Sequence, residues 1–124
     1  MICILCDQPV WRDALAALLR EFSYECPTAP VPPGEWGGAD LLLTAQSRPC
    51  ETLAADLEQA RDLSPGLRLV CLCETAADLA SWLPLQPDGI VLQQDGTPVL
   101  VDAIASVLDG RVFRSASVLA TGTC

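Results

Sequence analysis

The chain has 124 residues, of which 51% are apolar, which is enough for one globular core and excludes a disordered chain. Its formal net charge is −9, so the chain is expected to repel nucleic-acid phosphates, and any DNA contact would belong to another domain. Zinc sites and catalytic pairs that need histidine are excluded, because the sequence has none. No apolar run approaches the roughly 20 residues that span a bilayer. We expect a cytoplasmic protein without a metal or cofactor and without membrane contact.

The first third of the chain predicts a strand, a helix and a long irregular segment. Residues 1–6 (MICILC) are an apolar run with no polar face, typical of a strand buried on both sides of a parallel sheet. Pro9 suits a first helical turn, and apolar residues recur at helical spacing from Trp11 to Phe22. Residues 24–26 are a candidate for a brief second strand. Residues 27–38 hold four prolines and three glycines, which exclude a regular helix of any length.

The rest of the chain alternates strands with helices. Strands are predicted at residues 40–45, 67–73 and 90–93, and helices at residues 51–63, 75–83 and from Thr97 to a cap at Gly110. The small, polar residues from Ser115 predict a fraying end or the start of a linker. This order predicts an α/β fold of the flavodoxin-like (CheY-like) kind, with three α/β/α layers. The expected parallel sheet has five strands in the order 2-1-3-4-5, and the second helix is shortened or missing.

Four motifs then occur in the order and approximate spacing of a known family. They are residues 6–15 (CDQPVWRDAL), residues 40–49 (DLLLTAQSRP), residues 88–93 (DGIVLQ) and the segment from Thr97-Pro98 to Gly110. Together they resemble the receiver domains of LuxR-type bacterial response regulators, which act in two-component signal transduction and transcription regulation. The resemblance covers residues 1–113 and leaves residues 114–124 as a tail or the start of a linker.

The resemblance implies a site for phosphoryl transfer, and the sequence lacks most of it. Receivers of this family hold Mg²⁺ with a pair of acids and a phosphoacceptor aspartate, and a Ser/Thr hydroxyl and a lysine stabilise the phosphoryl oxygens. The acid pair falls on Cys6 and Asp7. The phosphoacceptor falls on Ala45, or on Thr44 with a slip of one residue. The hydroxyl position falls on Cys73 and the lysine on Gln93. This degenerate pocket predicts that the chain is neither phosphorylated nor an enzyme.

Other interpretations of the same residues stay open. The pocket residues are either a decayed site or a niche for a small molecule, and decay is favoured because no convergent polar set is evident. Asp7 is either a helix cap or a remnant metal ligand. Cys6 and Cys73 suggest a redox pair, but core packing is favoured, because a strand would separate them and no cation would activate a thiolate. Cys50 and Cys124 are the candidates for exposed thiols.

The resemblance also implies contact with other proteins. Receivers of this family dimerise through their first and last helices, or through the fourth helix with the last strand and helix. We expect a homodimer or a partner protein, and DNA binding through a separate helix-turn-helix domain that is not in this chain. A small-molecule sensor is the alternative function. Trp11 is expected in the core and Trp36 over the sheet or against a partner. The candidate interaction surface comprises Trp82, Ile90, Val101 and Ile104.

Overall fold

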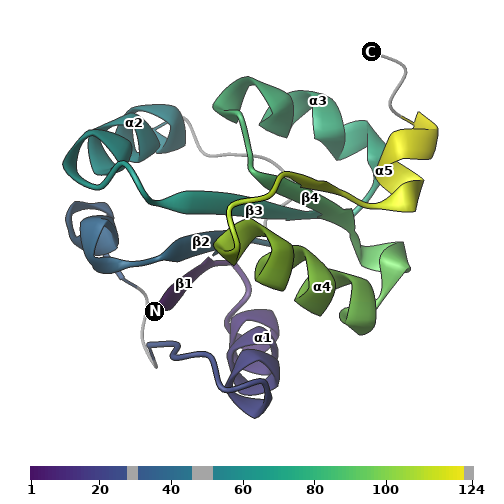
Figure 1. Ribbon diagram of the computed structural model, residues 1–124, viewed down its shortest axis with the longest axis horizontal. Helices are drawn as coiled ribbons and strands as arrows, with labels where there is room; N and C mark the ends of the chain where they lie inside the picture. The colour runs from purple at the N-terminus through teal and green to yellow at the C-terminus, as the bar shows by residue number, and fades with distance from the viewer. Residues whose placement is uncertain (28–30, 46–51, 122–124) are drawn as a thin grey trace.

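The computed structural model describes residues 1–27, 31–45 and 52–121. A five-stranded parallel sheet runs in the order β1-β2-β3-β4-β5 between two layers of helices (Figure 1). The strands are β1 (Ile2–Leu5), β2 (Leu41–Thr44), β3 (Arg68–Cys73), β4 (Gly89–Leu92) and β5 (Phe113–Arg114). The α/β class, the parallel sheet and four of its strands, β1 to β4, are as the sequence predicts.

Helices α1 (Pro9–Glu21) and α4 (Thr97–Leu108) cover one face of the sheet. Helices α2 (Leu53–Leu63), α3 (Leu79–Trp82) and α5 (Ala116–Thr121) cover the other face. In the described part of the chain, four short 3-10 segments connect the elements: η1 (Pro33–Gly38), η2 (Ala76–Asp78), η3 (Leu83–Leu85) and η4 (Gln93–Asp95). Of the helices that the structure describes, none is long and apolar enough to cross a membrane.

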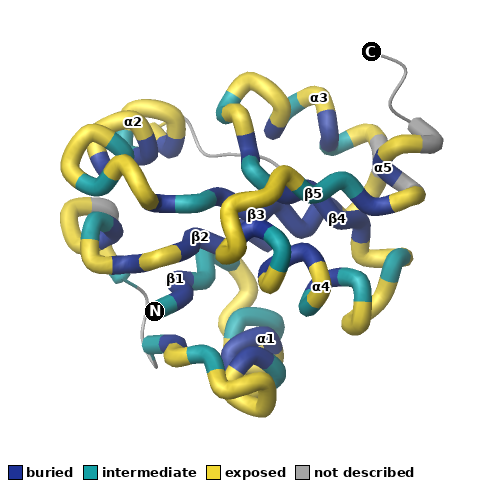
Figure 2. The backbone as a smooth tube through the Cα atoms, viewed as in Figure 1, coloured by how far each residue is buried: buried dark blue, intermediate teal, exposed yellow. Residues whose placement is uncertain are grey.

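The core consists of two apolar layers, one on each face of the sheet. Side chains alternate between the faces along each strand, so Val70 and Leu72 pack toward α1 and α4, whereas Leu69, Cys71 and Cys73 pack toward α2 and α3. Figure 2 shows the buried strands at the centre and the exposed outer turns of the helices. Because the strands are covered on both faces, they consist almost entirely of apolar residues.

The predicted strand order 2-1-3-4-5 is wrong. Residues 24–26 lie beside β1, where the Ile2 N–H donates to the Glu25 carbonyl (2.8 Å), but they form no strand. Pro27 follows and has no N–H with which to extend the pairing. The fifth strand is β5, at the opposite edge, where the N–H of Phe113 donates to the carbonyl of Asp88 (2.9 Å).

Two further segments form helical structure that their composition does not predict. The Pro/Gly-rich stretch contains η1, whose Trp36 is 2% exposed and donates its indole N–H to the Val31 carbonyl (3.0 Å). Trp36 therefore covers the sheet, the first of the two roles considered for it. The expected fraying end forms α5 instead, where Val118 is buried and its N–H is bonded to the Ser115 hydroxyl (3.3 Å).

Candidate functional site

The carboxyl ends of β1, β2, β3 and β4 meet at one edge of the sheet, since all these strands are parallel. Ligands of open α/β sheets bind at this edge, because the loops that follow the strands leave crevices there. The edge has a hollow of about 380 Å³, which we call the polar hollow. Its lining includes Asp7, Gln8, Trp11, Ala45, Glu74 and Gln93.

Three of the five predicted pocket residues come together in this hollow. Asp7 follows β1, Ala45 follows β2 and Gln93 follows β4, and all three line the polar hollow. Thr44 does not line it, because its hydroxyl is directed to the Val70 carbonyl (3.5 Å) and the residue is fully buried. Of the two positions predicted for the phosphoacceptor, Ala45 lines the polar hollow and Thr44 does not.

Asp7 is not the cap of α1. The residue before that helix is Gln8, and no side chain caps its first turn. Asp7 is instead an exposed acid at the rim of the polar hollow.

Cys6 lies beside the hollow without lining it. Its thiol is within donating distance of the carbonyl oxygens of Gln8 (3.4 Å) and Ala45 (3.8 Å). Cys3 and Cys6 have the spacing C-x-x-C, but positions three apart on an extended chain project to opposite sides. Cys3 accordingly packs under α2, and Cys6 packs against the layer of α1 and α4.

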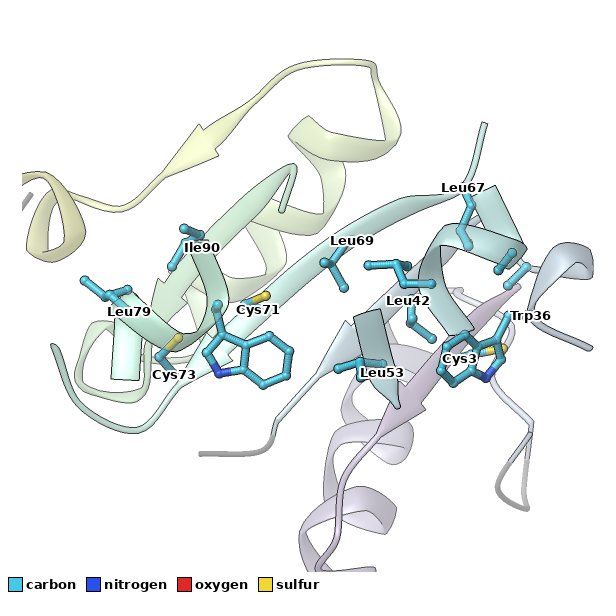
Figure 3. Packing of buried hydrophobic residues seen from close by; sticks show 14 of the residues in the cluster. Cys3, Trp36, Leu42, Leu53, Leu67, Leu69, Cys71, Cys73, Leu79 and Ile90 are labelled. Carbon is cyan, nitrogen blue, oxygen red and sulfur yellow. The ribbon is translucent and has the colours of Figure 1, made fainter. Parts of the chain in front are cut away.

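Cys73 is not in the pocket, which corrects its predicted place. Figure 3 shows Cys73 beside Leu79, and Cys71 near Ile90, on the face of the sheet that α2 and α3 cover. Burial, together with a smaller effect of the nearby Asp78 carboxylate, raises the pKa of Cys73 to about 12. Cys6 and Cys73 therefore lie on opposite faces, and the geometry gives no support to a redox pair.

Glu74 is the pocket residue that sequence reasoning missed. It follows β3 and lines the polar hollow together with Leu72, whereas Cys73 between them faces away. Strict alternation along residues 70–74 is the signal that would have found it, because Val70, Leu72 and Glu74 share one face.

Burial also raises the pKa of the remaining core thiols that the structure describes. The pKa of Cys71 rises to about 12 through burial, against a weaker opposing effect of its hydrogen bond with Thr44. The pKa values of Cys3 and Cys26 are raised as well, mainly by burial. These cysteines behave as small buried hydrophobes, as the sequence predicts. Cys50 and Cys124 lie outside the described residues.

The candidate interaction surface is wrong for three of its four members. Trp82, Ile90 and Ile104 are fully buried, and only Val101 is partly exposed. Trp82 and Ile90 pack in the layer under α3, and Ile104 packs in the layer under α4. Trp11, which we expect in the core, is only partly buried, at the wall of the polar hollow.

Among the described residues, the lining of the polar hollow is acidic and polar, and it contains no hydroxyl, thiol or lysine side chain. Its charged lining residues are the carboxylates of Asp7 and Glu74, and its amides come from Gln8 and Gln93. All seven basic residues of the chain are arginine, so the chain offers no lysine for the role that the resemblance assigns to the position of Gln93. Among the described residues, no group of three or more potential ligands from His, Cys, Asp and Glu could hold a metal ion.

No protein-family model matches the sequence, and no curated protein matches it significantly. Solved structures do match. The isolated receiver domain of RcsB from Salmonella enterica serovar Typhimurium, in the presence of the phosphomimetic BeF₃⁻, is 22% identical with a TM-score of 0.69. The alignment covers 97% of this chain and 96% of that domain.

Two further structures extend this likeness. A LuxR-family two-component response regulator from Aurantimonas sp. SI85-9A1 is 18% identical, with a TM-score of 0.71 over 97% of this chain and 92% of that one. RcsB in its complex with DNA is 22% identical, with a TM-score of 0.72, and this chain spans 65% of its length. The chain therefore has the fold of the receiver domains of LuxR-type response regulators.

Proposed function

We propose that this chain is a receiver-like module of a bacterial response regulator that signals without phosphorylation and without catalysis, by binding a second copy of itself or another protein. The observation on which this rests is the methyl group of Ala45 in the polar hollow, at the end of β2, where a receiver has its phosphoacceptor. The fold supports the assignment to a signalling module, and the altered pocket supports its independence from phosphate.

The reaction of a receiver needs groups that this hollow does not supply. Mg²⁺ prefers several oxygen ligands, and the transferred phosphoryl group needs positive charge around its oxygens. Asp7 has Cys6 as its neighbour instead of a second acid, and Gln93 is neutral where a lysine is needed. Acidic side chains at the rim would repel an incoming phosphate.

The test is incubation with acetyl phosphate and Mg²⁺, followed by intact-mass measurement. We expect no gain of a phosphoryl group, while a receiver domain with a complete site, treated in parallel, gains one. A stable phosphorylated species of this chain would overturn the proposal.

The surface that best suits a second copy is the outer side of α4. This helix has one charged residue, Asp102, whereas α2 has four: Asp56, Glu58, Arg61 and Asp62. In a chain with a net charge of −9, a nearly neutral face is where two copies meet with the least repulsion. RcsB is described in dimers bound to DNA. For this chain, we place any DNA contact on a separate helix-turn-helix domain.

Light scattering tests this surface with a matched pair of variants. Ala105 on α4 and Ala55 on α2 are both exposed, and arginine is nearly as good a helix former as alanine. We expect the wild-type chain to be a dimer, Ala105→Arg to be a monomer and Ala55→Arg to remain a dimer. A wild-type monomer at high concentration would count against self-association and leave only a partner protein.

A further inference from the structure

A separate cavity lies between α1 and β1, the edge strand of the sheet (Figure 1). Arg12 and Arg20 of α1 line it, so we call it the arginine cavity. It shares no described lining residue with the polar hollow. Its volume is about 180 Å³, below the roughly 300 Å³ at which sites for drug-sized molecules begin, so a ligand held there is small.

The two arginines lie on one stripe of α1, eight residues apart. At 1.5 Å per residue, their Cα atoms are separated by about 12 Å along the helix axis. Ala16 lies midway between them and also lines the cavity, and its small side chain leaves room between the two longer ones. The cavity therefore has a positive group toward each end and an apolar middle.

Arg12 has more hydrogen-bond donors than partners. A guanidinium carries five N–H donors, and a largely shielded one needs acceptors for them. The Arg12 side chain is 21% exposed, and its ion pair with Asp13 is loose, with 3.6 Å between Nη2 and Oδ1. This distance is too long for a hydrogen bond. Arg12 thus lines the cavity with donors that an anionic ligand can use.

Arg20 is held at the cavity by the backbone. Its Nη2 donates to the Cys26 carbonyl (3.0 Å), a neutral acceptor that leaves the positive charge of Arg20 uncompensated. Ile4, Pro27 and Val31 complete the described lining with apolar surface. Residues 28–30 lie outside the described part of the chain, and their sequence, TAP, carries no charge.

The chemistry of this lining favours a carboxylate at each end of a short carbon chain. Carboxylates match the planar guanidinium fork and accept two parallel hydrogen bonds from it. The distance between Arg12 and Arg20 along α1 favours two separated carboxylates over one compact anion. Asp13 also lines the cavity and opposes an anion, but its side chain is 71% exposed, so solvent screens this repulsion.

We propose that the arginine cavity binds a short linear dicarboxylate. One carboxylate pairs with Arg12 and the other with Arg20, and the methylene groups between them lie against Ala16 and Ile4. The site goes beyond the proposed function, because it lies apart from the polar hollow and does not depend on the state of Ala45.

Glutarate is a suitable probe, since three methylene groups separate its two carboxylates. We would titrate it into the ¹⁵N-labelled chain at weakly acidic pH and constant ionic strength, and follow the arginine Nε–H signals. Those of Arg12 and Arg20 are identified by their loss in Arg12→Gln and Arg20→Gln. We expect both signals to shift and to saturate.

Three related molecules test which feature of glutarate is recognised. Pentanoate has the same number of carbons and one carboxylate, and we expect it to bind roughly fivefold more weakly. Inorganic phosphate, a compact anion, is also expected to bind more weakly than glutarate. Cadaverine has five carbons with an ammonium group at each end, and we expect it not to bind.

Variants then test the individual charges, with binding followed by backbone amide shifts. Arg12→Gln and Arg20→Gln should each lower glutarate affinity roughly fivefold and remove its advantage over pentanoate. The matched control is Arg111→Gln, which removes one positive charge from a side chain that is 75% exposed and does not line the cavity. It should leave the affinity unchanged, because salt screens distant charges. Asp13→Asn should raise the affinity about twofold, a change that loss of fold cannot mimic.

Four results would overturn this site. They are no saturable shift with glutarate, equal or tighter binding of pentanoate or phosphate, an equal response of Arg12→Gln and Arg111→Gln, and no gain in affinity in Asp13→Asn. The last comparison decides even where an arginine variant does not fold. None of these results bears on the intact-mass experiment with acetyl phosphate, so failure of this site and failure of the proposed function are distinguishable.

Discussion

At the scale of single residues, Ala45 presents a methyl group in the polar hollow, where the proposed correspondence with a receiver would have a carboxylate. Asp7 and Glu74 already line the same hollow, although two exposed carboxylates alone hold a divalent ion weakly. Ala45 itself is 8% exposed, so a side chain added there is held close to its neighbours.

We expect Ala45→Asp to acquire Mg²⁺ binding. A third carboxylate beside Asp7 and Glu74 raises the repulsion in the hollow, so the variant should melt below wild type without metal. Millimolar Mg²⁺ should restore part of this loss by binding only the folded state, and it should leave the wild type unchanged. Thermal melts with Mg²⁺ and with sodium at matched ionic strength make the comparison. An equal response of both proteins to Mg²⁺ would contradict the expected role of Ala45.

At the scale of elements, α4 packs closely on β4 at Gly89. A Cβ on Gly89 would lie 3.0 Å from Val107 Cγ2 and 3.2 Å from Val70 Cγ2. Both valines are fully buried, so neither has free space into which it can move.

Gly89→Ala is therefore expected to destabilise the fold. Overpacking costs about 1–3 kcal/mol, which outweighs the roughly 0.4–1 kcal/mol gained by restricting the unfolded chain. Urea unfolding measures the difference. The double variant Gly89→Ala with Val107→Ala should be more stable than Val107→Ala alone, because Val107→Ala removes the nearer of the two methyl groups that the added Cβ would meet. A stabilised Gly89→Ala would show that α4 shifts away from the sheet at little cost.

The C-terminal elements provide a test of where the folded unit ends. Val118 on α5 is buried in the layer under α3, and Ser115 is 2% exposed. Removal of residues 115–124 exposes this part of the core and should cost at least about 1.5 kcal/mol, the value of burying one valine side chain. Removal of residues 122–124 alone is the control and should leave the urea midpoint close to that of the full chain. Equal midpoints for both truncations would favour a unit that ends near residue 113.

The sequence predicts those elements whose signal is strong over several residues. Doubly buried apolar runs identify β1 to β4, and helical spacing identifies α1, α2 and α4, because both patterns follow directly from the geometry of covered elements. Residues 24–26 and β5 are too short for any periodicity, so the sequence cannot decide which of them pairs with the sheet. Their position depends on the tertiary contacts of the chain around them.

The site is only partly predictable for a related reason. Motif spacing locates Asp7, Ala45 and Gln93, since each directly follows a strand. It fails at the end of β3, where the choice between Cys73 and Glu74 depends on which face a residue occupies. It also fails for Trp82, because a helix of one turn has no stripe that would reveal its buried side.

At the scale of the whole molecule, the layer under α2 and α3 contains two thiols that must remain protonated. Burial raises the pKa of both Cys71 and Cys73 from the ordinary value of 9.0 to about 12 in the folded chain. In the unfolded chain these thiols return to solvent and to their ordinary pKa. Between about pH 9 and pH 12, therefore, the unfolded state holds fewer protons than the folded state.

The free energy of unfolding is accordingly expected to be highest below about pH 9, the ordinary pKa of the thiols. It should fall as the pH rises toward about 12, their pKa in the folded chain. Each thiol contributes a slope of about 1.4 kcal/mol per pH unit within this window. Urea unfolding at a series of pH values from neutral to alkaline, with a non-thiol reductant present, measures the slope. Cys73→Ala should reduce the alkaline slope by the contribution of one thiol. This holds whatever effect the substitution has on the free energy of unfolding at neutral pH.

A matched core variant separates this linkage from a general loss of stability. Val91→Ala removes buried apolar volume from a strand without removing a titrating group, so it should lower the whole curve and leave its alkaline slope as in wild type. If Cys73→Ala and Val91→Ala show the same slope as wild type, the Cys73 thiol cannot be held protonated by the fold. Its place in the dry layer beside Leu79 and under α3 would then be wrong.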